Sequence, residues 1–400
     1  MTYAMNVKEA SFALGTNPPD FDTIISFDLA GRMIGAYLRE PDGREANFRR
    51  GFDNRVIRLV KDATLRNRWI EELPALERDE LLARCFEIVR QAQERGRWNQ
   101  TERGLLGRAA ANGPAELDRQ REQFLSIYGS VPILPPDQYR AVVLQVTRGC
   151  PFNECDFCFF YRGCEFRVLG GPDFDAHLKA VRSFFGESLR LRQSVFLGDA
   201  NAVLVPTRVL LERMQQARLV FEIAPPDLTP REEAAWRREH PCGLVGFYSF
   251  LDGLSGARKR LDDYRELAAA GLKRVYIGAE SGCDEFLERV RKPCRREQVV
   301  ETVRLCKQAG VAVGLIFLAG IGQDDPPLAE RHVEETLSLA TSLPLGAGDL
   351  IYLSPYVPER GAAPCLPSFV EAQLDGLESR LRASVGGCRV VVYDIRGFIY

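Results

Sequence analysis

The chain has 400 residues, of which 46% are hydrophobic and 27% charged. These proportions are typical of a folded globular protein and exclude disordered, collagen-like and coiled-coil chains. Its 53 basic and 55 acidic side chains leave a net charge of −2, so no overall field favours nucleic acid or an anionic membrane surface. The N-terminus lacks a basic stretch followed by an apolar core, and the longest apolar run, residues 311–322, is shorter than the roughly 20 residues that span a bilayer. We therefore expect a cytoplasmic protein with no membrane partner.

The first 70 residues read as β-rich. Residues 23–28 and 33–39 form apolar or alternating runs around Ala30-Gly31, which predicts a hairpin. Pro41-Asp42-Gly43 predicts a second turn, and residues 46–50 a third strand. Two successive hairpins indicate a small β-meander over residues 1–70.

The pattern becomes helical over residues 71–136. Apolar side chains recur at helical spacing between Leu82 and Ala92, and residues 116–128 predict another helix. Residues 131–136 are a stiff, proline-rich segment and an expected domain boundary. The sequence therefore predicts a meander over 1–70, a helical segment and linker over 71–136, and a third region over 137–400.

Strands and helices alternate in this third region. The predicted strands are apolar on both faces, which indicates a buried parallel sheet; they cover residues 141–147, 194–199, 244–250, 273–279, 311–318 and 349–354. The predicted helices cover residues 174–185, 207–217, 258–270, 284–308 and 329–343, and residues 219–242 add a short strand and a helix. Six such units predict an α/β fold with a partial (β/α)6 barrel, to which the strand-like residues 388–395 could add an edge. An open doubly wound sheet is the alternative, and in both folds the chemistry gathers at the carboxyl ends of the strands.

The chain has 11 cysteines and three histidines. An odd number of cysteines in a chain with cytosolic character argues against a disulfide framework, and three scattered histidines argue against a histidine-rich metal site. Seven cysteines are isolated and are interpreted as small core side chains: Cys85, Cys242, Cys283, Cys294, Cys306, Cys365 and Cys388.

Cys150, Cys155 and Cys158 follow the first predicted parallel strand, so they lie on a loop at its carboxyl end. Three thiolates with this Cys-x4-Cys-x2-Cys spacing can bind three irons of a [4Fe–4S] cluster. If Cys164 does not bind the fourth iron, that iron stays open for a ligand; if it does, the cluster is closed and suits electron transfer. A zinc site is a further alternative, but no histidine lies nearby. Purely structural thiols are another, but thiols on an exposed loop seldom belong to a core.

The segment Thr147-Arg-Gly-Cys-Pro-Phe-Asn-Glu-Cys-Asp-Phe-Cys158, followed by Tyr161-Arg-Gly and Phe166-Arg, resembles the radical S-adenosylmethionine (SAM) superfamily. More narrowly, it resembles an uncharacterised Fe–S oxidoreductase branch in which four residues, instead of the usual three, fill the first gap. The resemblance extends through residues 195–201, 206–207, 276–282 and 393–400, and covers about residues 141–400.

This resemblance implies a radical SAM enzyme in which Cys150, Cys155 and Cys158 hold one [4Fe–4S] cluster and the open iron chelates the methionine part of SAM. One electron, from a low-potential donor such as ferredoxin or flavodoxin, would cleave SAM, and the resulting 5′-deoxyadenosyl radical would abstract hydrogen from an unidentified substrate. The alternative is a non-catalytic Fe–S electron-transfer or interaction protein with Cys164 as the fourth ligand.

The resemblance also implies contacts to SAM. Asp199 or Asn201, after the second strand, would accept from the methionine ammonium. Glu280, followed by Ser281, would bind the ribose hydroxyls, unless its role is that of a helix N-terminal carboxylate. Phe157 would direct its edge toward the adenine or simply pack the loop.

Further candidates are less specific. Ser249 could contact the carboxylate or the ribose, and Gly314 and Gly320 could let the backbone approach the adenine. Arg148 or Arg162 could offset the cluster charge or hold the SAM carboxylate. Tyr161 and Tyr352 are candidates for a hydrogen donor or acceptor at the active face. The Arg49-Arg50 pair suggests a solvated hairpin edge, so nucleic acid is not an expected partner.

Overall fold

The computed structural model describes residues 2–39, 43–60, 69–357 and 367–400. The turn expected at Pro41-Asp42 and the isolated Cys365 lie outside these residues. The chain forms two compact units. Unit 1 comprises Met1–Leu134, Ala180–Gln193 and Arg396–Tyr400, and unit 2 comprises Pro135–Lys179 and Ser194–Ile395. The three-part division at residues 70 and 136 stays a prediction from the sequence. Within the described residues, no helix combines the length and apolar character that crossing a membrane would take.

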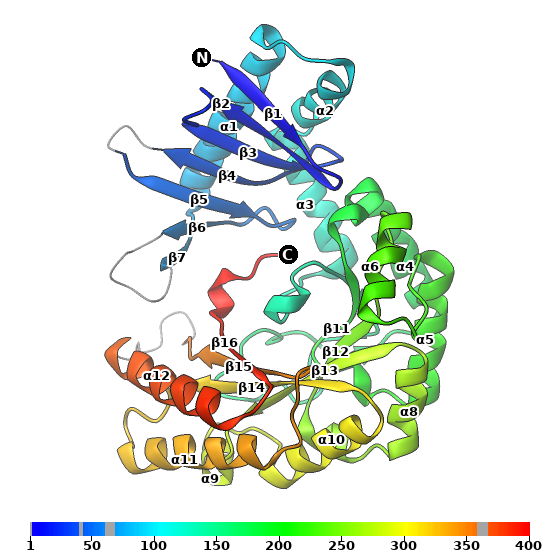
Figure 1. The fold of residues 1–400 in the computed structure, drawn as a ribbon, viewed down its shortest axis with the longest axis vertical. Coiled ribbons are helices and arrows are strands. Elements are labelled where there is room, and N and C mark those ends of the chain that lie inside the picture. Colours follow the sequence, from blue (N-terminus) through cyan, green and yellow to red (C-terminus); the bar gives the residue numbers. More distant parts are fainter. Residues whose placement is uncertain (1, 40–42, 61–68, 358–366) are drawn as a thin grey trace. The chain divides into compact units, whose positions relative to one another are not determined.

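Unit 1 contains a seven-stranded antiparallel sheet in which each strand pairs with the next along the chain (Figure 1). Its strands are β1 (Tyr3–Val7), β2 (Ser11–Thr16), β3 (Thr23–Asp28), β4 (Met33–Arg39), β5 (Glu45–Arg50), β6 (Val56–Val60) and β7 (Trp69–Glu72). The expected meander is therefore present but larger than the three strands predicted. The additional strands flank the three predicted ones on both sides: β2 and β6 contribute core residues such as Leu14 and Val56, whereas the edge strand β1 has no buried residue.

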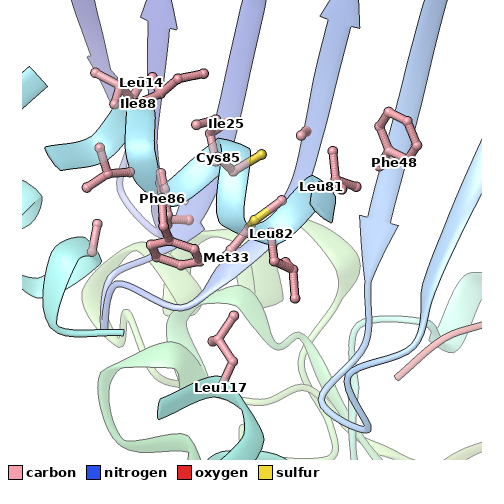
Figure 2. Close-up of a cluster of buried hydrophobic side chains, with 14 of the residues drawn as sticks. Leu14, Ile25, Met33, Phe48, Leu81, Leu82, Cys85, Phe86, Ile88 and Leu117 are labelled. Carbon is pink, nitrogen blue, oxygen red and sulfur yellow. The ribbon is translucent and has the colours of Figure 1, made fainter. Parts of the chain in front are cut away.

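Three helices cover one face of this sheet: α1 (Ala75–Arg95), α2 (Gln100–Ala111) and α3 (Pro114–Tyr128). Figure 2 shows how Leu82, Cys85 and Phe86 of α1 pack against strand residues such as Leu14 and Ile25. Cys85 is fully buried in this cluster, as expected for a small core side chain.

Unit 2 contains a sheet of seven parallel strands. In spatial order they are β8 (Ala141–Gln145), β11 (Ser194–Gly198), β12 (Phe247–Leu251), β13 (Leu272–Glu280), β14 (Ala312–Ala319), β15 (Leu350–Pro355) and β16 (Arg389–Val392). The spatial order is also the chain order, as in a (β/α) barrel, whereas a doubly wound sheet reverses at a switch point. The predicted α/β partial barrel is therefore confirmed, with β16 beside β15 as a seventh strand. A short hairpin, β9 (Thr147–Arg148) with β10 (Arg167–Val168), follows β8.

The helices of this region include one correction to the sequence prediction. The helix expected over residues 284–308 is two helices, α9 (Asp284–Arg289) and α10 (Arg296–Gln308). Pro293 lies in the interruption and cannot continue a helix, because it lacks an N–H donor and its ring clashes with the preceding turn. The other helices are α4 (Gly171–Phe185), α5 (Thr207–Val220), α6 (Pro230–Glu239), α7 (Gly253–Ala257), α8 (Leu261–Ala269), α11 (Pro326–Ser342) and α12 (Pro367–Ser384).

Candidate functional site

The cysteine loop follows β8 and β9 at the carboxyl end of the parallel sheet. Cys150, Cys155 and Cys158 are half-buried, whereas Cys164 is exposed. The pKa of Cys155 is raised to about 12, mainly by burial; Lys292 opposes the shift, whereas Glu280 and the thiols of Cys158 and Cys150 add to it. Burial also raises the pKa of Cys158. Three half-buried thiols on one loop form a donor set that suits bound cations, since a metal deprotonates the thiols that it binds.

Side-chain and backbone bonds hold this loop in place. Asn153 Nδ2 donates to the carbonyl oxygen of Tyr161 at 2.7 Å, and the backbone N–H of Asn153 donates to Cys150 Sγ at 3.4 Å. Asp156 donates its N–H to the Val290 carbonyl at 3.1 Å and forms an ion pair with Arg291. The interruption between α9 and α10 is thus tied to the cysteine loop. In the part of the chain that the structure describes, no group of three His, Cys, Asp or Glu side chains is arranged to bind a single metal ion. An Fe–S cube does not need such a group, because each of its thiolates binds a different iron.

A buried ion pair lies next to this loop. Lys292 Nζ lies 3.0 Å from Glu280 Oε1, with side-chain exposures of 12% and 9%. The Lys292 ammonium also lies 5.8 Å from the centre of the Phe157 ring. Burial opposes the charge of Lys292, but Glu280 and Cys155 outweigh it and raise its pKa. Sequence reasoning missed Lys292 because this residue fell inside the single helix expected there.

The backbone at Glu280 and Gly278 accommodates the ion pair of Glu280 and Lys292. Glu280 ends β13 with a φ of 60°, a left-handed conformation that is rare for residues other than glycine and is found preferentially at functional sites. Gly278 precedes it on the same strand. A Cβ atom at Gly278 would lie 2.6 Å from Glu280 Oε1 and 3.1 Å from Lys292 Nζ, so the ion pair occupies the space that this glycine leaves.

Asp199 follows β11 and is held by three bonds. Its Oδ1 accepts from Gln145 Nε2 at 3.0 Å, its Oδ2 accepts from the Gly149 N–H at 3.1 Å, and its own N–H donates to Thr147 Oγ1 at 3.0 Å. Burial raises the pKa of Asp199 to about 6, although the bonds from Gln145 and Gly149 oppose the shift. Asp199 therefore joins the carboxyl end of β11 to the residue that precedes Cys150.

Asn201 has a buried oxygen without a partner. Asn201 Nδ2 donates to an Asp252 carboxylate oxygen and, at 3.2 Å, to Ser255 Oγ. A carboxylate accepts only, which fixes the orientation of the amide. Asn201 Oδ1 then remains buried with no hydrogen-bond donor among the described residues. A buried acceptor without a donor is costly, so this atom suits an ammonium or hydroxyl group of a ligand. Asp252 and Ser255 were not singled out from the sequence.

The structure places the other predicted contacts as follows. Ser249 is fully buried, and its hydroxyl donates to the Leu197 carbonyl at 2.9 Å. The Ser281 hydroxyl lies 2.7 Å from His332 Nδ1. Phe157 packs against the apolar cluster of Cys283, Phe286, Val290 and Leu328.

Both candidate glycines occupy crowded positions. Gly320 has a φ of 87°, and a Cβ there would lie 2.7 Å from a Val370 methyl carbon. A Cβ at Gly314 would lie 2.6 Å from the Tyr276 ring. Close packing therefore accounts for the absence of a side chain at both positions.

The remaining candidates differ in position. Arg148 lies opposite Arg167 in the β9–β10 pair, and Arg162 is exposed. Tyr161 is buried on the cysteine loop. The Tyr352 hydroxyl donates at 2.6 Å to Asp137 Oδ1, and Asp137 precedes β8. This bond connects the Tyr352 hydroxyl to the segment that leads into the amino end of the sheet.

The cysteine loop and the strands that follow it match a known family. Residues 144–332 match the radical SAM superfamily. The resemblance to the radical SAM superfamily is thus confirmed for these residues. Enzymes of this superfamily bind a [4Fe–4S] cluster and SAM, which are the two cofactors expected from the resemblance.

Similar proteins include 4′-phospho-dehydrooxetanocin synthase from Priestia megaterium, which is 24% identical over 218 residues, 53% of this chain and 28% of that protein. This chain thus spans little more than a quarter of that relative. Among solved structures, coproporphyrinogen III oxidase from Escherichia coli, a radical SAM enzyme, is 14% identical over 65% of this chain and 55% of its own, with a TM-score of 0.43. A cobalamin-dependent radical SAM enzyme is 15% identical over 69% of this chain and 33% of its own, with a TM-score of 0.38.

Proposed function

We propose that this protein cleaves SAM reductively at one [4Fe–4S] cluster and uses the resulting radical to abstract hydrogen from a substrate that is still unidentified. The single observation that carries the proposal is the placement of three half-buried thiols, Cys150, Cys155 and Cys158, on one loop beside the buried ion pair of Glu280 and Lys292. Bound together, a reduced cluster and SAM supply one-electron cleavage of the sulfonium C–S bond, which yields methionine and a 5′-deoxyadenosyl radical.

The three thiolates would hold the cluster and leave one iron open. The exposure of Cys164 supports this assignment over the alternative in which that thiol closes the cluster, because Cys164 lies on a more open part of the loop than the other three. A low-potential donor such as ferredoxin or flavodoxin would supply the electron.

The polar groups at the carboxyl ends of the strands would bind SAM. Asp199 and the unpartnered Asn201 Oδ1 are acceptors for the methionine ammonium. Glu280 would accept from the ribose hydroxyls. After its bond to Glu280, the Lys292 ammonium has donors left for the methionine carboxylate. Ser249, Ser281, Phe157 and Gly320 remain proposed contacts of the same cofactor.

Anaerobic reconstitution tests the proposal. The protein is loaded with iron and sulfide, reduced with dithionite and given SAM, and the release of 5′-deoxyadenosine is measured by chromatography. We expect release by the wild type and by Cys164→Ala with unchanged iron content, and loss of both iron and product in Cys155→Ala. Iron loss in Cys164→Ala, without 5′-deoxyadenosine from the wild type, would instead identify a closed electron-transfer cluster.

A further inference from the structure

The turn that follows Glu280 is held by one helix, α11. The residues of this turn, Ser281, Gly282 and Cys283, join β13 to α9. The Gly282 N–H donates to Thr336 Oγ1 at 2.9 Å, and a Cβ at Gly282 would lie 2.2 Å from the carbonyl oxygen of Glu335. The turn therefore lies directly against the backbone of α11.

His332, one turn before Thr336 on α11, holds the same segment through its ring. Its Nε2 lies 3.1 Å from the carbonyl oxygen of Leu318, near the end of β14. A carbonyl only accepts, so Nε2 carries the proton and Nδ1 is an acceptor. Nδ1 then accepts from the Ser281 hydroxyl at 2.7 Å, and Ser281 Oγ in turn accepts from the Cys283 N–H at 3.0 Å.

The surroundings of His332 keep it neutral and fixed. The side chain is fully buried, and its ring lies 4.7 Å from that of Phe286 in α9. Burial lowers the pKa of His332 to about 4. The neutral ring thus connects the ends of β13 and β14 to α11 through one donor and one acceptor.

We propose that His332 is a positioning residue for SAM binding: it fixes the Ser281–Cys283 turn, and thereby the left-handed backbone that presents the Glu280 carboxylate. The inference rests on the proposed function, in which Glu280 and Ser281 contact SAM. In metal sites, removal of a group that orients a ligating residue typically costs about 10- to 100-fold in affinity or activity, and we expect a loss toward the lower end of that range here.

Two variants separate the two bonds of the ring. His332→Asn retains an acceptor near the position of Nδ1 and so can still hold Ser281. His332→Gln retains a donor near the position of Nε2 and so can still reach Leu318, but it offers Ser281 no matched acceptor. Leu339→Ala is the control, because Leu339 is a fully buried residue of the same helix whose truncation lowers stability without touching the turn.

Binding of SAM to the reconstituted protein is measured by equilibrium dialysis, alongside iron content. We expect the dissociation constant to rise about tenfold in His332→Gln and to stay within about threefold of wild type in His332→Asn and Leu339→Ala, with equal iron content in all. An unchanged dissociation constant in His332→Gln, or equal losses in all three variants, would overturn the inference.

Amide hydrogen exchange of the cofactor-free protein separates this inference from the proposed function. The Gly282 and Cys283 amides should exchange faster in His332→Gln than in His332→Asn or Leu339→Ala. If the wild type binds no SAM, the proposed function and the binding role of His332 both fail. If the wild type binds SAM but these amides exchange equally in all variants, the positioning role alone fails.

Discussion

Lys292 Nζ lies 3.0 Å from Glu280 Oε1 with both side chains almost entirely buried. Neither charge is stable there alone, because the surroundings replace only part of the water that each group loses. Gly278 leaves room for the pair, and Phe157 covers the ammonium. The pair therefore holds a carboxylate and a cation at the edge of the sheet where the cysteine loop begins.

Breaking this pair from one side should destabilise the cofactor-free protein strongly. We expect Lys292→Met and Glu280→Gln each to lower the free energy of unfolding by about 3–5 kcal/mol, and the double variant to lose much less than the sum. Urea denaturation of the four proteins gives the coupling energy. The matched control is the exposed pair Arg304–Glu301, for which we expect a far smaller coupling energy because solvent screens both charges. Additive losses at Lys292 and Glu280 would contradict the interpretation.

Removing a cluster thiol should not unfold the protein. Cys155 lies on a half-buried loop, whereas the core of unit 2 is the parallel sheet. We expect Cys155→Ala to lose iron while its circular-dichroism spectrum and urea midpoint stay those of the cofactor-free wild type. Cys306→Ala, which truncates a fully buried side chain of α10, should instead lower the midpoint. A melted spectrum for Cys155→Ala would show that the loop is part of the folding core.

Asp199 should make stability fall with rising pH. Its pKa is raised by burial from 3.8 to about 6, so between these values the folded state keeps a proton that the unfolded state has lost. Stability from this group is present below pH 3.8 and is lost as the pH rises through about 6. Between pH 4.5 and 7.5, the stability of Asp199→Asn relative to wild type should rise by about 2 kcal/mol. A constant difference in urea denaturation at the two pH values would contradict this prediction.

His332 should have the opposite effect in an overlapping range. Burial lowers its pKa from 6.5 to about 4, so between these values the unfolded state binds a proton that the folded state rejects. Its contribution is fully present above pH 6.5 and is lost as the pH falls toward 4. Between pH 7.5 and 4.5, wild type should lose about 2.5 kcal/mol relative to His332→Gln. The same denaturation experiment tests this, and an equal pH dependence of the two proteins would contradict it.

The space beside α11 should not admit a side chain at Gly282. A Cβ there would meet the Glu335 carbonyl oxygen at 2.2 Å, and backbone cannot move aside as a flexible side chain can. We expect Gly282→Ala to lower stability by about 1–3 kcal/mol and to weaken SAM binding. Gly104→Ala is the control, since a Cβ at this position in α2 meets nothing within 4 Å, and alanine should stabilise that helix by about 0.5–1 kcal/mol.

The strands of unit 2 were predictable because they are buried on both faces. β11 and β15, for example, consist of buried residues along their whole lengths, so the sequence shows continuous runs there. The edge strand β1 has no buried residue and is held by pairing with β2, a relationship that one sequence does not display. The sequence predicts one helix in place of α9 and α10 because their apolar spacing continues across Pro293.

The cluster cysteines could be found from the sequence because their spacing is short and local. Lys292 could not, because its significance comes from Glu280 across the loop rather than from neighbours in the chain. Asp252, Ser255 and His332 likewise acquire their partners through the fold. A polar side chain directly after a strand, such as Asp252 after β12, was the available signal.

The interruption between α9 and α10 is fastened at both of its ends. Arg291 pairs with Asp156, and the Arg296 N–H donates to Asp284 Oδ1 at 2.7 Å. Lys292 therefore reaches Glu280 from a fixed position 12 residues farther along the chain. In natural variants that keep both charges, insertions and deletions should be absent from this interval, even where the amino acids between them vary freely.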